Sequence, residues 1–454
     1  MPTFQATATV LGLLLIAGAL LSGLAQRSFL SLTALFVLAG FALGPGGFGW
    51  MDFRAHSGFV EDLAFAALIV ILFRDGLEVE GEMLKREWHL PARKLVLAMP
   101  ITATIAAVAA HVLFGFSWTE SFLIGALLSP TDPVLTSSIV TNLRVPRLIR
   151  HSLNLESGLN DGLALPAVLA LLAALSVDSG NFVWWRFVIQ DLGLGLLYGL
   201  ACGWLASLLM PRPRGASGKG AASGTGMDVG VGMGMGARAA SASGTETRSD
   251  AGTHARKRGR DQHGRDRSLE HSIPAHQKSL FALGVAFATY GLTVLSPEGN
   301  GFIAVFVAAI VLGIRRPDLR VHFEQRADEL VEIVKLGIFF VFGSLLTLNA
   351  LTREGWPALA FVAIVFLLAR PLAVWLALLG TSTDRATRLF MGWFGPKGVA
   401  TMTFALLVLD QNIAAGPRIF DLTALVVFCS IIVHGLSDTP GANWIAAHTE
   451  RQQT

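Results

Sequence analysis

The sequence is poor in charged residues and in cysteine. Only 15% of its 454 residues are charged, whereas 53% are hydrophobic; soluble globular proteins average roughly 25% charged residues. This composition excludes an ordinary soluble domain and indicates an integral membrane protein. The two cysteines, Cys202 and Cys429, lie in apolar segments, and there is no Cys/His cluster. We therefore expect neither a disulfide nor a resident metal site.

The N-terminus lacks the basic region of a signal peptide, so residues 5–24 are predicted to be a retained first helix. The net charge of +3 does not suggest nucleic-acid binding. If the N-terminus is outside, most basic residues near the membrane fall in inside loops, as the positive-inside rule requires. These inside residues are Arg27, Lys85, Arg86, Arg93, Lys94, Arg144, Arg147, Arg315, Arg316, Arg320, Arg385 and Arg388.

The apolar segments predict an all-α fold with about thirteen transmembrane helices, since a helix needs about 20 apolar residues to cross the hydrocarbon core. The candidate spans are residues 5–24, 28–45, 59–77, 92–114, 120–140, 148–177, 183–210, 279–296, 300–314, 330–350, 357–380, 386–409 and 419–436. Their distribution suggests two inverted six-helix repeats, an architecture common among transporters.

Residues 211–278 differ from the rest of the chain. They contain 13 Gly and 12 Lys or Arg but no Phe, Trp or Tyr. Such a segment cannot bury enough apolar surface to offset its ordering entropy, so we predict a disordered cytoplasmic linker. Its basic run at 255–267 could contact anionic lipid or another partner, but a solvated tether that follows the positive-inside rule is the favoured interpretation. The linker separates a first membrane block (1–210) from a second (279–437), which a short cytoplasmic tail (438–454) follows.

Two predicted spans are interrupted at corresponding positions of the two blocks. SPTDPV (129–134) contains Pro130 and Pro133, and GPKG (395–398) contains Pro396. Proline removes a backbone N–H and disrupts a helix. Freed carbonyls at membrane depth need partners or a water-filled cavity. Paired breaks of this kind indicate a transport site, with the broken helices crossing near the bilayer midplane.

The span at 148–177 carries polar residues that are costly in a membrane. Glu156 and Asn160 are four residues apart, as are Ser157 and Asp161. At 100° per residue these four side chains cover about 140° of one helix face. A carboxylate at the bilayer centre costs about 2.5–3.5 kcal/mol on insertion scales, so this polar face indicates pairing or function.

Oxygen-bearing side chains beside the first break suit a hard monovalent cation, which prefers carboxylate, hydroxyl and carbonyl ligands. The candidate ligands are Thr131, Asp132, Ser157 and Asp161. A carboxylate in a partly dry cavity can also hold a proton near working pH. Competition between the two ions for one carboxylate is the minimum chemistry of exchange.

SPTDPV followed by ESGLNDG (156–162) resembles the bacterial sodium/proton antiporters of the monovalent cation:proton antiporter superfamily, in its Asn-Asp branch. The resemblance extends to NGFIAVFVAAIVLG (300–313), LARPLAV (368–374) and GPKGVA (395–400). It implies that Asp161 binds the transported cation and the proton in turn. Ser157 and Thr131 would be further ligands of that cation, and Asp132 would lie at the helix break, in or near the site.

The same resemblance implies a set of supporting residues. Glu156 would pair with Arg370 beneath the site, with Asn160 linked to that pair. Asn160 stands where the electrogenic branch has a second Asp. Lys397, where many relatives have Arg, would lie in the second broken helix and offset the facing helix dipoles.

The resemblance also implies electroneutral Na⁺/H⁺ exchange by alternating access, without a cofactor. Spans 4–6 and 11–13 would form the moving core, and the others a scaffold that forms a homodimer. The protein would lie in the bacterial inner membrane, with the linker and C-terminus cytoplasmic, and its partners would be monovalent cations, protons and lipid.

Three alternatives remain open at this point. K⁺/H⁺ exchange uses the same fold and the same oxygen ligands, and Li⁺ is a further substrate. A cation channel would need a continuous pore lined by rings of carbonyls or charges, whereas paired broken helices favour alternating access. An intramembrane aspartyl protease would use Asp132 and Asp161, but the GxGD context of such enzymes is missing.

Overall fold

The structure, a computed structural model, describes residues 32–51, 53, 57–79, 89–132, 139, 142–176, 183–210, 275–295, 299–411 and 413–453, and four single positions before them. All regular secondary structure in these ranges is helical, which confirms the predicted all-α fold. Most of the predicted first span, residues 211–274 of the predicted linker, and Pro133 lie outside the described residues. The count of thirteen spans and the inverted repeats stay predictions.

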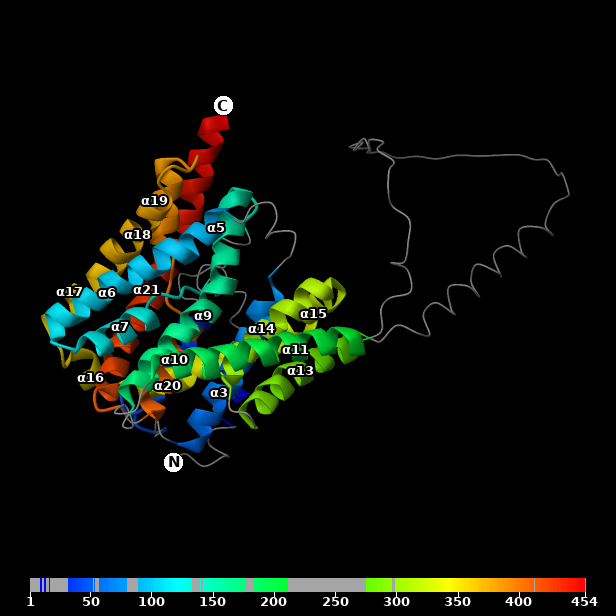
Figure 1. Cartoon of the computed structure of the whole chain (residues 1–454). Helices are drawn as coiled ribbons and strands as arrows, with labels where there is room; N and C mark the ends of the chain where they lie inside the picture. The colour runs from blue at the N-terminus through cyan, green and yellow to red at the C-terminus, as the bar shows by residue number, and fades with distance from the viewer. Residues whose placement is uncertain are drawn as a thin grey trace, which may run out of the picture.

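Figure 1 shows the arrangement of the helices. The helices overlap the predicted apolar segments, although their bounds differ in places. They are α2 (Leu32–Leu43), α3 (Gly58–Leu77), α5 (His89–Arg93), η1 (Lys94–Ala98), α6 (Met99–Phe114), α7 (Trp118–Leu127), α9 (Arg147–Leu175), α10 (Trp184–Arg186), η4 (Phe187–Leu194), α11 (Gly195–Leu209), α13 (Ala275–Leu295), α14 (Gly301–Arg315), α15 (Pro317–Leu345), α16 (Leu348–Thr352), α17 (Trp356–Ala363), η5 (Ile364–Ala369), α18 (Arg370–Ala377), α19 (Arg385–Trp393), α20 (Val399–Asp410) and α21 (Gly416–Gln453). Six continuous helical stretches among the described residues are long and apolar enough to cross a membrane: His89–Phe114, Arg147–Leu175, Trp184–Leu209, Gln277–Leu295, Trp356–Ala377 and Gly416–Arg451.

The helices pack into two groups that meet along α3, α9, α15 and α20. In the first group α6 packs on α7, α7 on α9, α18 on α19, and α20 on α21. In the second group α14 packs on α3, α11 and α13, and α15 packs on α2 and α13. Figure 1 shows the first group, with α6, α18 and α19, on one side and α11, α13, α14 and α15 on the other. The boundary between the groups positions the candidate site.

Two π-helical segments, η1 and η5, interrupt the helices that precede the two breaks. Each is followed at the second residue of the next helix by a proline, Pro100 in α6 and Pro371 in α18. Because proline cannot donate the i→i−4 hydrogen bond, the preceding turn widens at that point. The segments lie against each other's helices, η1 on α18 and η5 on α6. Their matched positions are consistent with the predicted repeats.

The last helix extends further than the sequence suggested. α21 runs from Gly416 to Gln453 and includes Pro440, so the structure has no break where the predicted tail begins at residue 438. The extension packs through Ala442 and Ile445, which are buried. This packing compensates for the hydrogen bond that the proline removes.

Candidate functional site

The two interrupted helices cross at their breaks. α7 ends at Leu127, and α19 ends at Trp393 before α20 resumes at Val399. The two non-helical segments touch through a backbone hydrogen bond of 2.9 Å from Asp132 N to Pro396 O. SPTDPV and GPKG are therefore in direct contact, through residues that are 264 positions apart in the sequence (396 − 132).

Each break supplies a charge to the helix end of the other. Asp132 Oδ2 accepts a 3.1 Å hydrogen bond from Val399 N, at the start of α20, where the helix dipole is positive. Lys397 Nζ donates to Pro130 O at 3.1 Å, beyond the C-terminal, negative end of α7. Lys397 lies in the second break, and its charge faces the negative end of α7. The two side chains thus form hydrogen bonds with the backbone groups of Pro130 and Val399, which lipid could not do.

The glycines of GPKG make room for these contacts. A Cβ at Gly398 would overlap the carboxylate and Cβ of Asp132. A Cβ at Gly395 would overlap the guanidinium of Arg370. Any residue larger than glycine at either position would push the two crossing segments apart.

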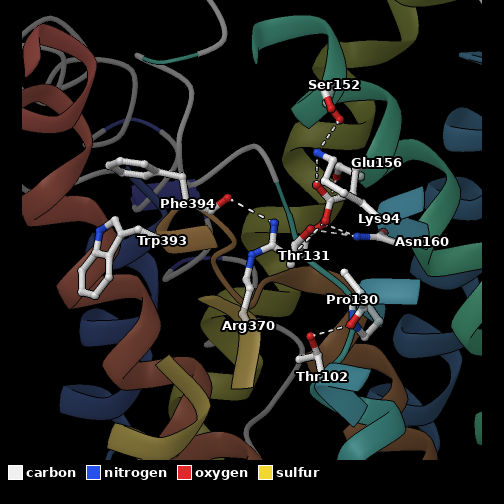
Figure 2. Close-up of polar contacts among 12 residues, drawn as sticks. Lys94, Thr102, Pro130, Thr131, Ser152, Glu156, Asn160, Arg370, Trp393 and Phe394 are labelled. Atoms are coloured by element: carbon white, nitrogen blue, oxygen red, sulfur yellow. Dashed lines mark hydrogen bonds and ion pairs between the residues drawn. The ribbon is translucent and has the colours of Figure 1, made fainter. Parts of the chain in front are cut away.

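The polar face of α9 lies against the first break (Figure 2). Ser157 Oγ donates to Thr131 O at 2.9 Å. Asn160 Nδ2 donates to the same carbonyl at 3.0 Å and to Thr131 Oγ1 at 2.9 Å. The carbonyl freed by the helix break is thus satisfied from α9. The expected link from Asn160 to the Glu156–Arg370 pair is wrong, because the hydrogen bonds of this amide go to Thr131 instead.

Asp161, on the same face of α9, has a buried carboxylate oxygen that no hydrogen bond satisfies. Its side chain is 7% exposed, and its Oδ1 has no hydrogen-bond partner. It borders a cavity of about 20 Å³, which is room for roughly one water-sized particle. The cavity lies between the two helix groups and is lined by Ile71, Arg74, Asp75, Glu78, Asp132, Asn154, Ser157, Gly158, Asp161, Lys335, Val399 and Ala400.

The cavity contains an acid that the sequence did not assign to the site. Asp75, on α3, is 6% exposed and lines the same cavity as Asp161. Two ionised carboxylates can only accept, so a hydrogen bond between them would need one proton. Arg74 approaches Asp75 at 3.7 Å, but it lies closer to Glu78, at 2.8 Å.

A second, separate cluster surrounds Glu156 (Figure 2). The predicted ion pair with Arg370 is confirmed, with Nη1 to Oε1 at 3.0 Å. Lys94 Nζ lies 2.6 Å from Oε2 and also donates to Ser152 O at 3.1 Å. Arg370 Nη2 donates to Phe394 O at 3.3 Å, which links α18 to the second break. Both oxygens of this carboxylate are therefore engaged.

Lys94 corrects the sequence interpretation, which assigned it to an inside loop. Lys94 is 1% exposed and is the first residue of the π-helical segment η1. The predicted span at 92–114 already included residue 94, and this was the available signal. The resemblance pointed to a single partner for Glu156, and Lys94 is the second.

One carboxylate in this arrangement can hold a small cation or a proton. The proteins that the sequence matches exchange ions of these two kinds. The sequence matches the family described as "Sodium/hydrogen exchanger, transmembrane" over residues 12–213 and 266–444. The chain belongs to this family. Sodium/hydrogen exchangers are transporters rather than enzymes, and the ions they move are substrates rather than cofactors. The unmatched residues 214–265 fall within the predicted linker.

Individual relatives agree with this assignment. The K(+)/H(+) antiporter NhaP of Alkalimonas amylolytica is 23% identical over 460 residues, covering 100% of this chain and 69% of that protein. The K(+)/H(+) antiporter NhaP2 of Shewanella sp. (strain MR-4) is 27% identical over 432 residues, covering 93% and 64%. The chain thus spans about two thirds of the length of these curated relatives.

The fold is that of a solved exchanger. The sodium proton antiporter MjNhaP1 of Methanocaldococcus jannaschii, solved at pH 8, superposes with a TM-score of 0.71. The match covers 97% of each chain at 19% sequence identity. At this identity the comparison supports the fold alone.

Proposed function

We propose that the protein exchanges one monovalent cation for one proton across the membrane, binding the two in turn at Asp161. The observation that carries this proposal is the buried Asp161 carboxylate, whose Oδ1 is unpartnered beside a cavity of about 20 Å³. A buried carboxylate is costly unless something neutralises it. A proton and a dehydrated cation are the two candidates that fit this space.

The ligand set follows from the cavity lining. Asp161 and Asp75 supply carboxylate oxygens, and Asp132 adds a third while capping α20. Ser157 donates its only proton to Thr131 O, so the lone pairs of its hydroxyl are available to a cation. Thr131 contributes chiefly by fixing Ser157 and Asn160, rather than as the direct ligand that the resemblance implied.

The supporting residues hold the site in place. Glu156 and Arg370 join α9 to α18, and Lys397 joins the two breaks. Asn160 fixes the first break against α9 without adding charge. The carrier would expose the cavity to each side alternately by movement between the two helix groups, because the site lies at their boundary.

K⁺/H⁺ exchange is a second candidate, and a specific observation favours it. The two relatives named above, which match 93–100% of this chain, are K(+)/H(+) antiporters. Na⁺ and K⁺ are both hard cations that take oxygen ligands, so this site chemistry accommodates either.

The proposal includes a setting for the protein. We place it in a bacterial inner membrane as a homodimer, with its N-terminus outside and its C-terminus in the cytoplasm. The positive-inside distribution supports this orientation. The segment at 211–278 would be a cytoplasmic tether able to contact anionic lipid, although α13 already begins at Ala275.

Everted membrane vesicles from cells without their own antiporters provide the test. A pH gradient is established, then Na⁺, K⁺ or Li⁺ is added and a pH-sensitive dye is followed. We expect cation-dependent collapse of the gradient that is lost in Asp161→Asn. Asp410→Asn, at the far end of α20, serves as the matched control and should retain exchange. Absence of a response to every cation between pH 6 and 9 would reject the proposal.

A further inference from the structure

Two polar residues of α21, Ser430 and His434, are buried at 0% and 2% exposure. They are four residues apart, so they lie on one face of the helix. Neither lines the cavity beside Asp161. Buried polar side chains in a membrane protein are costly unless they are hydrogen-bonded. Their presence on an otherwise apolar part of α21 therefore calls for a role.

The pair contacts the second break at two places. Ser430 Oγ accepts a 2.8 Å hydrogen bond from Lys397 N, inside the break. His434 Nε2 lies 3.1 Å from the carbonyl oxygen of Trp393, the last residue of α19. Because a carbonyl can only accept, Nε2 is the donor. A helix break leaves backbone groups short of intrahelical partners, and lipid supplies none. α21 supplies them here.

The two side chains also contact each other. His434 Nδ1 lies 3.1 Å from Ser430 Oγ and 3.0 Å from Ser430 O. A neutral ring with its proton on Nε2 accepts from the hydroxyl at Nδ1, whereas a charged ring donates to the carbonyl. Nε2 donates to Trp393 O in both states. The contact with the break therefore does not depend on the charge of the ring.

The first break is held in a comparable way. Ser157 and Asn160 of α9 both donate to Thr131 O. α9 follows the first break along the chain, and α21 follows the second. Each break is thus fixed by a serine and a second polar residue on a helix that comes later in the sequence. Ser430 and His434 are the counterparts of the pair on α9.

We propose that Ser430 and His434 are positioning residues, which fix the second break in the conformation that the ion site needs. The inference rests on the proposed function and adds two residues to it. The break that they hold contains Lys397, whose Nζ donates to Pro130 O. It leads directly into Val399, which lines the cavity beside Asp161.

The consequence for the ion site follows from this connection. Val399 N donates to Asp132 Oδ2, and both residues line the cavity. When the contacts with α21 are lost, the break can shift and carry the start of α20 with it. The cavity would then fit the cation less well, and the half-saturating cation concentration would rise.

The test compares His434→Leu, His434→Gln and Ser430→Ala with wild type in the vesicle assay. Leu fills the space without hydrogen bonds, Gln keeps an amide that can donate to Trp393 O, and Ala removes the acceptor of Lys397 N. The half-saturating cation concentration should rise about three- to tenfold in His434→Leu and in Ser430→Ala, the scale of one lost hydrogen bond. His434→Gln should behave as wild type does, which separates hydrogen bonding from packing.

Ser437→Ala is the matched control. Ser437 lies on the same helix and accepts from the indole Nε1 of Trp393 at 3.0 Å, so its bond goes to a side chain and not to the backbone of the break. Its half-saturating cation concentration should equal that of wild type. An equal rise in Ser437→Ala and His434→Leu would show a general loss of packing and overturn the inference.

Amide hydrogen exchange on detergent-solubilised protein tests the contact itself. The peptide over residues 394–400 contains the Lys397 amide, which should exchange about three- to tenfold faster in Ser430→Ala than in wild type. Ser430→Ala, the smaller change, keeps the test decisive if His434→Leu does not fold. Unchanged amide exchange, or faster exchange with an unchanged half-saturating concentration, overturns the inference. Failure of the proposed function is distinct, because wild type itself would then show no cation response.

Discussion

Two carboxylates on one helix, Glu156 and Asp161, have opposite surroundings. Glu156 lies between two cations, with Lys94 at 2.6 Å and Arg370 at 3.0 Å. Asp161, five residues later, has an oxygen with no partner and borders a cavity. A buried carboxylate that is fully compensated fixes structure, whereas an uncompensated one can accept an ion. On our proposal, Glu156 stabilises the fold, whereas Asp161 binds the transported ions.

The largest expected effect is at the uncompensated carboxylate. Asp161→Asn removes the exchangeable negative charge while preserving shape, so cation/proton exchange should fall at least about 100-fold, the scale of losing several kcal/mol of ion binding. Its thermal midpoint should equal or exceed that of wild type, because an unpaired buried charge has been removed. Vesicle exchange and melting in detergent check both expectations. Substantial exchange by this variant would place the site elsewhere.

The opposite pattern is expected at the compensated carboxylate. Glu156→Gln leaves Lys94 and Arg370 buried side by side without a counter-charge, which typically costs 3–5 kcal/mol. Its thermal midpoint should fall well below that of Asp161→Asn. Lys94→Met combined with Glu156→Gln should lose less stability than the sum of the two single variants, since the residues share one network. Additive losses would show that the cluster is not a unit.

Much of this arrangement followed from local sequence patterns. The two proline-containing breaks, the polar face of α9 and the Glu156–Arg370 pair were predicted, and the structure brings the breaks into contact and contains the pair. The breaks and the polar face could be predicted because the effects of proline and of helical periodicity act over a few residues. The resemblance supplied the pairing of Glu156 with Arg370, which spacing alone could not have given.

The remaining charged residues could not have been placed from local patterns. The sequence analysis places Lys94 in an inside loop and assigns neither Asp75 nor Lys335 to the site. Each is buried only because a helix distant in sequence packs over it: α9 over Lys94, and α9 and α15 over Asp75. Tertiary packing decides whether a charge near a helix end faces water or another charge, and one sequence does not contain that information.

The crossing between the two clusters should be sensitive to a single methyl group. In Gly398→Ala the new Cβ would overlap Asp132, and overpacking of this kind typically costs 1–3 kcal/mol. We expect exchange to slow about tenfold, with partial loss of stability. Gly284→Ala in α13, where a Cβ meets open space, is the matched control and should be neutral. Equal activity of the two variants would show that the crossing tolerates displacement.

The smallest effect is expected at an ion pair far from both clusters. Glu354, between α16 and α17, lies 2.6 Å from Arg418 Nε, and that hydrogen bond lowers the pKa of Glu354 below its usual value. A lowered carboxyl pKa stabilises the fold above the unfolded pKa of about 4.3 and loses that contribution as pH falls through the folded pKa. The Arg418 side chain is 35% exposed, so screening limits the contribution to about 0.2–1 kcal/mol. Glu354→Gln should therefore melt slightly below wild type at pH 7 and together with it well below pH 4, with exchange unchanged. A difference that persists in acid would mean that the pair acts through packing on Phe116, which Arg418 covers at 4.6 Å, rather than through charge.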